Sequence, residues 1–294
     1  SACFTPTARW KTVTLARVVT LGAPDGPGAF AGPPAVSPPL PDGRWVAWTD
    51  GSASDSARVF DSTGRYIRAL APVGDGAGQL RDVQAIVRGA GDSVVVIAGG
   101  RVSIFDRDLQ WVRSFPVPVT QVNAAAELAN GWLALASGEL VSGQGITLVD
   151  RSGKVVGTLA AKAVGEVERR YVQAGAANAV WTARATGKLE VDRWDTAGLR
   201  SELIPLSREW WPEYPMKASA PAGTAPLPFL SGFWLTEPDQ VWLVATVAGT
   251  GRPDAGLIEA TDLKHGLILA RTRFDEPFGS VVAPGLVARP RHEG

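Results

Sequence analysis

The sequence predicts an all-β protein built from a repeated four-stranded unit, and three observations support this prediction. Short runs of β-branched and aromatic residues alternate with turn residues along the chain. The 33 glycines and 22 prolines lie between these runs, as in sheet proteins with many turns. A short motif that ends in aspartate recurs at a nearly constant interval. With 45% hydrophobic residues, the 294-residue chain can bury the core of one large domain.

The recurring motif is an apolar or aromatic residue, an aspartate and, a few positions later, glycine or another turn residue. Its copies centre on Asp61, Asp106, Asp150, Asp195 and, more weakly, Asp262. The first four lie 45, 44 and 45 residues apart, and the gap of 67 before the fifth indicates an insertion of about 22 residues. Aspartate accepts backbone N–H groups in such a turn, so we expect structural turns here and not catalytic carboxylates.

Each copy of the motif has strand-forming segments on both sides. A turn residue opens the strand before it, as Asp42-Gly43 precedes residues 44–49, and another strand follows it, as in residues 65–70. A four-stranded antiparallel unit that repeats about every 45 residues is typical of a β-propeller blade. The five copies of the motif therefore predict five blades.

The two ends of the chain supply a sixth blade in this prediction. Residues 280–288 have the pattern of its inner strands, and residues 12–20 have the pattern of its outer strand. Closing the ring with an N-terminal and a C-terminal strand leaves no free sheet edge. We therefore expect a six-bladed β-propeller over residues 12–294, with an insert at 207–228 and a tether at 1–11.

Two linkers carry a second repeat. In Gly22–Phe30 and Gly74–Leu80, glycines at alternate positions precede an aromatic or apolar residue. Together with the blade repeat over about residues 12–290, this pattern resembles the six-bladed propellers of the NHL type. The resemblance implies the fold and an exported bacterial protein. It implies little about activity, because propellers host many unrelated functions.

The N-terminal segment contains the only cysteine, Cys3, so no internal disulfide is expected. Small residues directly before a near-terminal cysteine match part of a bacterial lipoprotein signal. We expect a lipid on Cys3 that anchors the protein to the membrane surface on the periplasmic side. The alternative is a free thiol on a loose N-terminal arm.

Residue types that carry chemistry are scarce. Lys+Arg and Asp+Glu number 29 each, without a basic stripe, so we expect no nucleic-acid partner. The two histidines, His265 and His292, lie in a turn and near the C-terminus. Asn123 and Glu127 are the one remaining pair of the kind that holds metal in lactonase-type propellers, and one pair does not make a site. We expect no cofactor, no metal and no catalytic residue.

Four of the 11 tryptophans follow a strand-opening turn and should lie at equivalent, buried places between blades: Trp45, Trp132, Trp181 and Trp242. The insert at 207–228 is different, because its five prolines oppose a helix or an internal strand. It concentrates residue types that are enriched at protein interfaces: Arg208, Trp210, Trp211, Tyr214 and Met216. We predict that these residues bind a partner. The alternative is that the loop folds back and covers one face of the propeller.

These features predict a non-catalytic binding or scaffold protein on the outer, periplasmic face of a bacterial membrane. It would be an accessory subunit of a membrane protein complex. Respiratory and photosynthetic complexes are candidate settings. The alternative is a periplasmic enzyme or small-ligand binder, such as a lactonase-like hydrolase, that uses the central channel. The residues that line the channel would distinguish the two.

Overall fold

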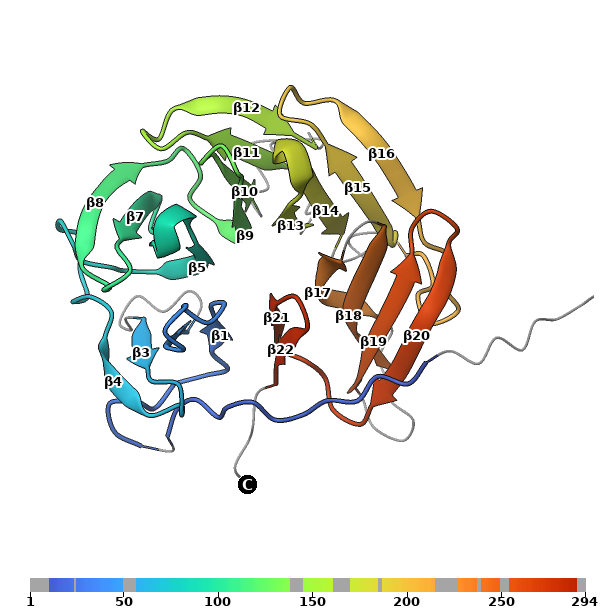
Figure 1. Cartoon of the computed structure of the whole chain (residues 1–294), viewed down its shortest axis with the longest axis horizontal. Coiled ribbons are helices and arrows are strands. Elements are labelled where there is room, and N and C mark those ends of the chain that lie inside the picture. Colours follow the sequence, from blue (N-terminus) through green and yellow to red (C-terminus); the bar gives the residue numbers. More distant parts are fainter. Residues whose placement is uncertain are drawn as a thin grey trace, which may run out of the picture.

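The computed structural model describes residues 11–23, 25–49, 57–137, 145–160, 170–184, 187–214, 227–236, 239–248 and 254–289. The chain forms a β-propeller in which five four-stranded antiparallel sheets and one two-stranded sheet are arranged around a central axis (Figure 1). The strands of each four-stranded sheet follow chain order from the axis to the rim. We number these sheets as blades 1 to 5.

Every blade is a simple meander. Blade 1 consists of β1 (Ala35–Val36), β2 (Trp45–Trp48), β3 (Arg58–Phe60) and β4 (Tyr66–Ala69). Blade 2 consists of β5 (Val83–Arg88), β6 (Val94–Ala98), β7 (Arg101–Phe105) and β8 (Trp111–Pro116). Blade 3 consists of β9 (Val122–Glu127), β10 (Leu133–Ser137), β11 (Ile146–Val149) and β12 (Val155–Leu159). Blade 4 consists of β13 (Arg170–Ala174), β14 (Val180–Arg184), β15 (Glu190–Trp194) and β16 (Arg200–Pro205). Blade 5 consists of β17 (Phe229–Thr236), β18 (Gln240–Ala248), β19 (Asp254–Asp262) and β20 (Leu267–Phe274). Two short 3-10 turns, η1 (Ala90–Asp92) and η2 (Ala176–Asn178), join the first two strands of blades 2 and 4.

The repeated aspartates begin the turn between the third and fourth strands of every blade. In blades 1 to 4, one carboxylate oxygen accepts the backbone N–H groups two and four residues later, at 2.8–3.0 Å. Asp262 in blade 5 accepts those two and three residues later, at 2.9 and 3.1 Å. Gly64, Gly153 and Gly198 supply a φ near +90° in three of these turns, which explains the glycine of the motif.

The hydrophobic core lies between successive blades. Val95, Ile97 and Phe115 of blade 2, for example, form one buried cluster with Leu133 and Leu135 of blade 3. The four repeated tryptophans take part in this packing. Trp45 is buried beside the two-stranded sheet, Trp242 stacks on Trp234 with ring centroids 5.3 Å apart, and Trp132 and Trp181 are half-buried.

The two-stranded sheet lies between blades 5 and 1. It consists of β21 (Ser280–Ala283) and β22 (Leu286–Ala288), and β21 contacts the inner strands β17 and β1. The chain therefore does place inner strands at 280–288. The prediction that residues 12–20 pair with them as an outer strand is wrong. Lys11 instead forms a parallel bridge with Ala270 of β20, donating to Leu269 and accepting from Arg271, so the backbone is held by blade 5.

Cys3 and the rest of the predicted tether before Lys11 lie outside the described residues. Among the residues that are described, none belongs to a helix with the length and apolarity that crossing a bilayer requires.

Candidate binding groove on blade 2

The start of the insert is bonded to blade 5 through a buried carboxylate. Glu259 of β19 is fully buried. It forms an ion pair with Arg208, accepts the Trp210 indole N–H at 2.9 Å and accepts Arg271 Nε at 2.8 Å. Arg208 also donates to the Thr261 hydroxyl at 2.8 Å. Arg208 and Trp210 therefore hold the insert against the propeller.

Trp211 packs even more deeply than its neighbour. Its side chain is 3% exposed, and its indole N–H donates to the Gly187 carbonyl at 2.8 Å. Trp210 meets it edge-on at 5.6 Å and Tyr214 stacks on it at 6.3 Å. These contacts enclose the Trp211 ring and are of the kind that the fold-back alternative expects. Partner binding by the insert stays a prediction. Met216 lies outside the described residues.

The other candidate residues are also placed by the structure. The Glu127 side chain is 5% exposed, forms an ion pair with Arg151 and accepts the Ala90 N–H at 3.3 Å, while Asn123 is half-buried on the same strand. The exposed His265 ring contacts Asp262 at 2.8 Å within their shared turn. In the described ranges, no three His, Cys, Asp or Glu side chains are grouped so that they could hold a metal ion.

Two glutamines on inner strands tie neighbouring blades together. Gln84 of β5 donates to the Thr120 carbonyl at 2.7 Å and accepts the Val122 N–H at 2.9 Å. Gln173 of β13 makes the same two bonds across the junction of blades 4 and 5. It donates to the Phe233 carbonyl at 2.8 Å and accepts the Leu235 N–H at 3.3 Å. Both amides use donor and acceptor on the backbone of the following blade, which identifies them as structural clamps.

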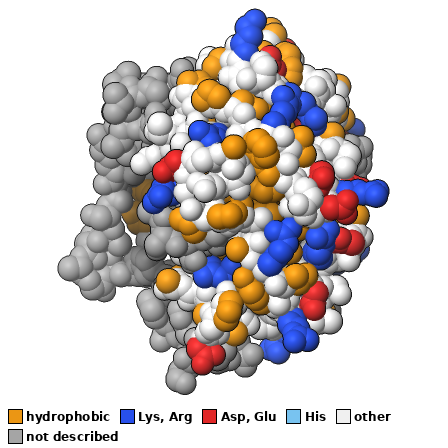
Figure 2. Space-filling view, turned by 90° about the vertical axis from the view of Figure 1, so that its left-hand side faces the viewer, with side chains coloured by type: hydrophobic (Ala, Val, Ile, Leu, Met, Phe, Trp, Pro, Cys, Tyr) orange, Lys and Arg blue, Asp and Glu red, His pale blue; other side chains and the backbone are white. Residues whose placement is uncertain are grey.

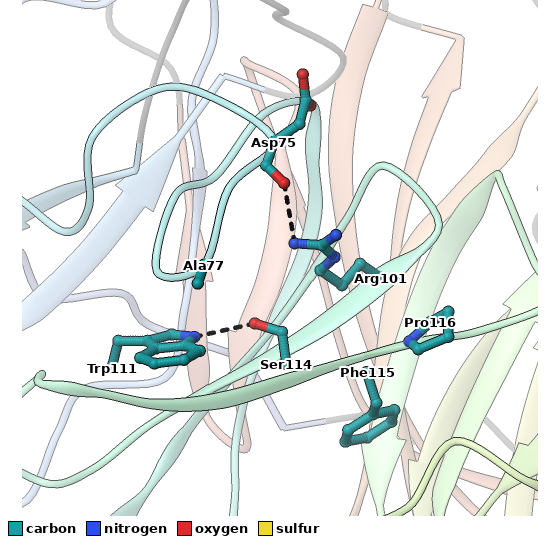
Figure 3. A pocket seen from close by; sticks show the side chains of 7 residues that line it. All are labelled: Asp75, Ala77, Arg101, Trp111, Ser114, Phe115 and Pro116. Carbon is teal, nitrogen blue, oxygen red and sulfur yellow. Dashed lines mark hydrogen bonds between the residues drawn. The ribbon is translucent and has the colours of Figure 1, made fainter.

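A groove of about 480 Å³ opens on the outer part of blade 2 (Figure 3). Its lining comes from β7, β8 and the linker before blade 2: Asp75, Ala77, Arg101, Trp111, Ser114, Phe115 and Pro116. Trp111, the first residue of β8, leaves 41% of its surface exposed. Trp111 is not one of the four tryptophans that repeat from blade to blade.

Hydrogen bonds fix the walls of this groove. The Trp111 indole N–H donates to the Ser114 hydroxyl at 2.9 Å, which in turn bonds the Ser103 hydroxyl at 2.9 Å. Arg101 donates to the Asp75 carbonyl at 3.1 Å and so holds the linker in place (Figure 3). Gly78 has a φ of +71°, and a Cβ there would come within 3.3 Å of the indole. The glycine thus allows the linker to lie directly against Trp111.

Blade 1 repeats this arrangement with a different aromatic residue. A Cβ on Gly28 would lie 3.2 Å from the Cβ of Tyr66, the first residue of β4. Arg58 of β3 donates to the Pro27 carbonyl at 3.0 Å, as Arg101 of β7 does to its own linker. The two glycine linkers therefore pack against the first side chain of the outer strands β4 and β8. Tyr66 and Trp111 each lie five residues after the repeated aspartate of their blade, Asp61 and Asp106, and this spacing is the signal in the sequence that points to Trp111.

Exposed apolar residues also lie on β4, in the linker before blade 2 and on β8. Ile67, Val73 and Val112 are 48%, 41% and 52% exposed. Figure 2 faces this side of the ring and shows hydrophobic side chains mixed with Lys, Arg, Asp and Glu. The surface therefore combines apolar area with charges of both signs, and Trp111 and Arg101 in the groove are residue types enriched at protein interfaces.

No protein-family model and no curated protein matches the chain. Solved structures do. The WD40 domain of Neurospora crassa Pan2 is 12% identical with a TM-score of 0.57, and the match covers 90% of this chain and 74% of that one. A Bacteroides fragilis protein assigned as exported is 12% identical with a TM-score of 0.52, over 90% and 74%. The extracellular domain of a protein assigned as a one-component system of B. thetaiotaomicron is 14% identical with a TM-score of 0.51, over 85% and 29%. These similarities establish the β-propeller fold.

Proposed function

We propose that this protein is a non-catalytic binding or scaffold propeller on the periplasmic side of a bacterial membrane, and that the groove on blade 2 contacts a protein partner. The observation that carries the proposal is Trp111, a large aromatic ring that is 41% exposed yet held by a hydrogen bond. Tryptophan and arginine dominate the binding energy of many protein interfaces. A ring already fixed in the free protein loses little conformational entropy on binding.

The use of buried charge supports a scaffold over a hydrolase. Three buried carboxylates are each held by arginine. Glu259 is held by Arg208 and Arg271, Glu127 by Arg151, and Asp192 by Arg170 at 2.6 Å. Catalytic carboxylates act on a substrate and so need an open side, whereas these side chains are at most 5% exposed. They stabilise the packing of the propeller.

The proposal includes the six-bladed, NHL-like ring. In it, β21 and β22 are the inner part of a sixth blade, because β21 contacts β17 of blade 5 and β1 of blade 1 as an inner strand would. The paired glycine linkers before blades 1 and 2 support the NHL-like assignment, since both seat the first residue of an outer strand.

The proposed location is the outer face of the membrane, with the protein anchored through a lipid on Cys3 as an accessory subunit of a membrane protein complex. Two solved propellers of similar fold are described as an exported protein and as an extracellular domain. Stable attachment by lipid needs more than one acyl chain, or one chain plus a protein contact. A partner at the groove would supply that second contact.

The test is copurification of the tagged chain from native membranes in mild detergent. We expect Trp111→Ala to lose the partner. Leu203→Ala is the matched control, because Leu203 has the same 41% exposure but lies on β16 of blade 4. Both variants should keep the melting temperature of the parent protein. Retention of the partner by Trp111→Ala would exclude the groove as the contact.

A further inference from the structure

We propose that the groove on blade 2 binds a proline-rich segment in the extended polyproline II conformation. The proposal rests on the proposed function, since it takes the groove as the partner contact, and it specifies the chemistry of the segment that the partner inserts. Grooves lined by aromatic side chains recur as sites for proline-rich segments, because this helix is already ordered before it binds. The hydrogen-bond donors that the groove leaves unused support the assignment.

The serine pair beside Trp111 determines which polar group the groove presents. The Ser103 side chain is 1% exposed, and among the described residues its hydroxyl bonds only the Ser114 hydroxyl, at 2.9 Å. A buried hydroxyl hydrogen without an acceptor costs free energy. Ser103 therefore donates this bond and Ser114 accepts it.

Ser114 accepts a second bond and keeps its own hydrogen. The Trp111 indole N–H donates to the same oxygen at 2.9 Å. A hydroxyl has two acceptor sites and one donor, so both acceptor sites are used. Ser114 is half-buried and lines the groove, and its side chain has no further bond within the described ranges. The groove therefore offers a free O–H donor directly beside an aromatic ring.

The other polar side chains of the groove present donors as well. Arg101 uses Nη1 for the Asp75 and Gly76 carbonyls, at 3.1 and 3.4 Å. A guanidinium has further N–H groups and no acceptor. The Asp75 carboxylate is paired with Arg81 at 3.2 Å, and Figure 3 shows it directed away from the other lining side chains. A bound segment therefore meets side-chain donors that need acceptors.

Proline is the residue whose backbone suits such a lining. Its carbonyl accepts hydrogen bonds, and it has no N–H that would need an acceptor. Any other residue brings an N–H into the groove, and burying that group unpaired costs free energy. The pyrrolidine ring also covers the face of Trp111, which is 41% exposed and whose own N–H is already used by Ser114. A proline on the indole with a carbonyl on Ser114 satisfies both groups.

The length of the groove fits a short segment of this kind. Trp111 begins β8 and Pro116 ends it, and a strand of this length spans about 17 Å. Figure 3 shows Trp111 and Pro116 toward opposite ends of the groove, with Arg101 beside Pro116. A polyproline II helix rises about 3.1 Å per residue and repeats every three residues, so about six residues follow this span. Two prolines three positions apart then face the same wall.

The test is isothermal titration calorimetry on the full chain. The probe is octaproline with blocked ends, and the comparison peptide is an alternating glycine-alanine octamer, which has an N–H at every residue. We expect saturable binding of octaproline and no binding of the comparison peptide at the same concentration. Trp111→Ala should weaken octaproline binding at least about 30-fold. Leu203→Ala, equally exposed on blade 4, should leave it unchanged.

The serine pair supplies a matched control. Both serine variants are made together with Trp111→Phe, because a phenyl ring keeps the apolar face and has no N–H that could replace the missing hydroxyl. Ser114→Ala removes the free donor and should weaken octaproline binding about 3- to 10-fold. Ser103→Ala removes only the buried donor, so the affinity should stay that of Trp111→Phe alone. Melting temperatures establish that each variant is folded.

The outcomes separate this proposal from the proposed function. Equal binding of the two peptides, or octaproline binding that survives Trp111→Ala, overturns the proline assignment. If octaproline does not bind but Trp111→Ala still loses the membrane partner, the proline assignment is wrong and the groove remains the contact. If octaproline binds at Trp111 but Trp111→Ala keeps the partner, the proline site stands and the proposed contact falls. Equal weakening by the two serine changes overturns the role of Ser114.

Discussion

Two tryptophans beside linkers between blades behave in opposite ways. Trp111 next to the linker before blade 2 is 41% exposed, while Trp211 in the linker before blade 5 is 3% exposed. The Trp111 indole bonds Ser114 three residues along its own strand, but the Trp211 indole bonds Gly187 on blade 4. The comparison teaches that burial of an aromatic ring depends on what lies opposite it, and not on how unusual its loop is.

The charged groups that hold the two linkers differ in the same way as the two tryptophans. The linker before blade 5 is held by the fully buried Glu259 and two arginines, whereas the linker before blade 2 is held by Arg101 bonded to backbone carbonyls. Breaking a buried ion pair leaves an uncompensated charge and costs far more than removing an exposed contact. The blade 5 linker should therefore govern stability and the blade 2 linker recognition.

The largest effect should come from Trp211→Ala. Removal of this ring leaves a cavity between blades 4 and 5, and we expect a loss of about 3–5 kcal/mol in the free energy of unfolding. Trp111→Ala should cost less than about 1 kcal/mol, because that ring is exposed. Urea denaturation of both variants measures the difference. Equal losses would break the comparison.

The next effect concerns the buried carboxylate. Glu259→Gln removes the negative charge between Arg208 and Arg271, and we expect a loss of about 3 kcal/mol. Glu209→Gln is the matched control, since Glu209 also pairs with Arg271 but its side chain is 69% exposed. Its loss should stay under about 1 kcal/mol. Chemical denaturation at neutral pH measures both losses. Equal losses would contradict the inference that the buried Glu259 contributes more stability than the exposed Glu209.

A smaller effect should come from the glycine under Trp111. Gly78→Ala forces a positive φ on a residue with a Cβ, at a cost of about 1–2 kcal/mol, and brings that Cβ against the indole. Gly26→Ala is the control, because Gly26 has a similar φ of +77° and open space around it. Only Gly78→Ala should shift the fluorescence emission of Trp111. That emission is obtained as the difference between the spectra of each variant with and without the additional change Trp111→Phe. The same spectrum in both variants would show that the linker does not seat the ring.

The smallest effect concerns a repeated aspartate. A hydrogen bond from the Thr63 hydroxyl, followed by backbone N–H groups, holds the pKa of Asp61 below its ordinary value. A depressed pKa in the folded state stabilises the fold above the unfolded pKa of about 3.9, and this contribution is lost as the pH falls through the folded pKa. Thr63→Val should raise the pKa of Asp61 and leave that of Asp150, which Ser152 lowers in the same way. Carboxyl NMR titration measures both, and a shift at Asp150 alone would refute the assignment.

Much of the fold could be predicted because its determinants are local. The turn from Asp61 to Arg65 is closed by bonds within five residues, so its sequence repeats wherever the turn does. The interval between copies then fixes the length of a blade, and β21 and β22 follow from their own strand pattern.

The candidate site could not be predicted from such patterns. Trp210 and Trp211 are conspicuous in the sequence, yet Glu259, more than 40 residues later, and Gly187, more than 20 residues earlier, enclose them. The predicted strand at 12–20 has the composition of a strand. Which neighbour its backbone bonds depends on the tertiary arrangement, and Lys11 just before it is held by β20. Neither the burial of these two rings nor the pairing of residues 12–20 can be read from the residues next to them in the sequence.

The sequence by itself determined the all-β class, the blade repeat and the turns, since these rest on hydrogen bonds between residues close in the chain. The tertiary structure alone decided which aromatic rings are exposed and which are enclosed. The physical reason is that burial and strand pairing are satisfied by groups distant in sequence, so Trp111 and Trp211 differ in exposure because of what the folded ring places opposite them.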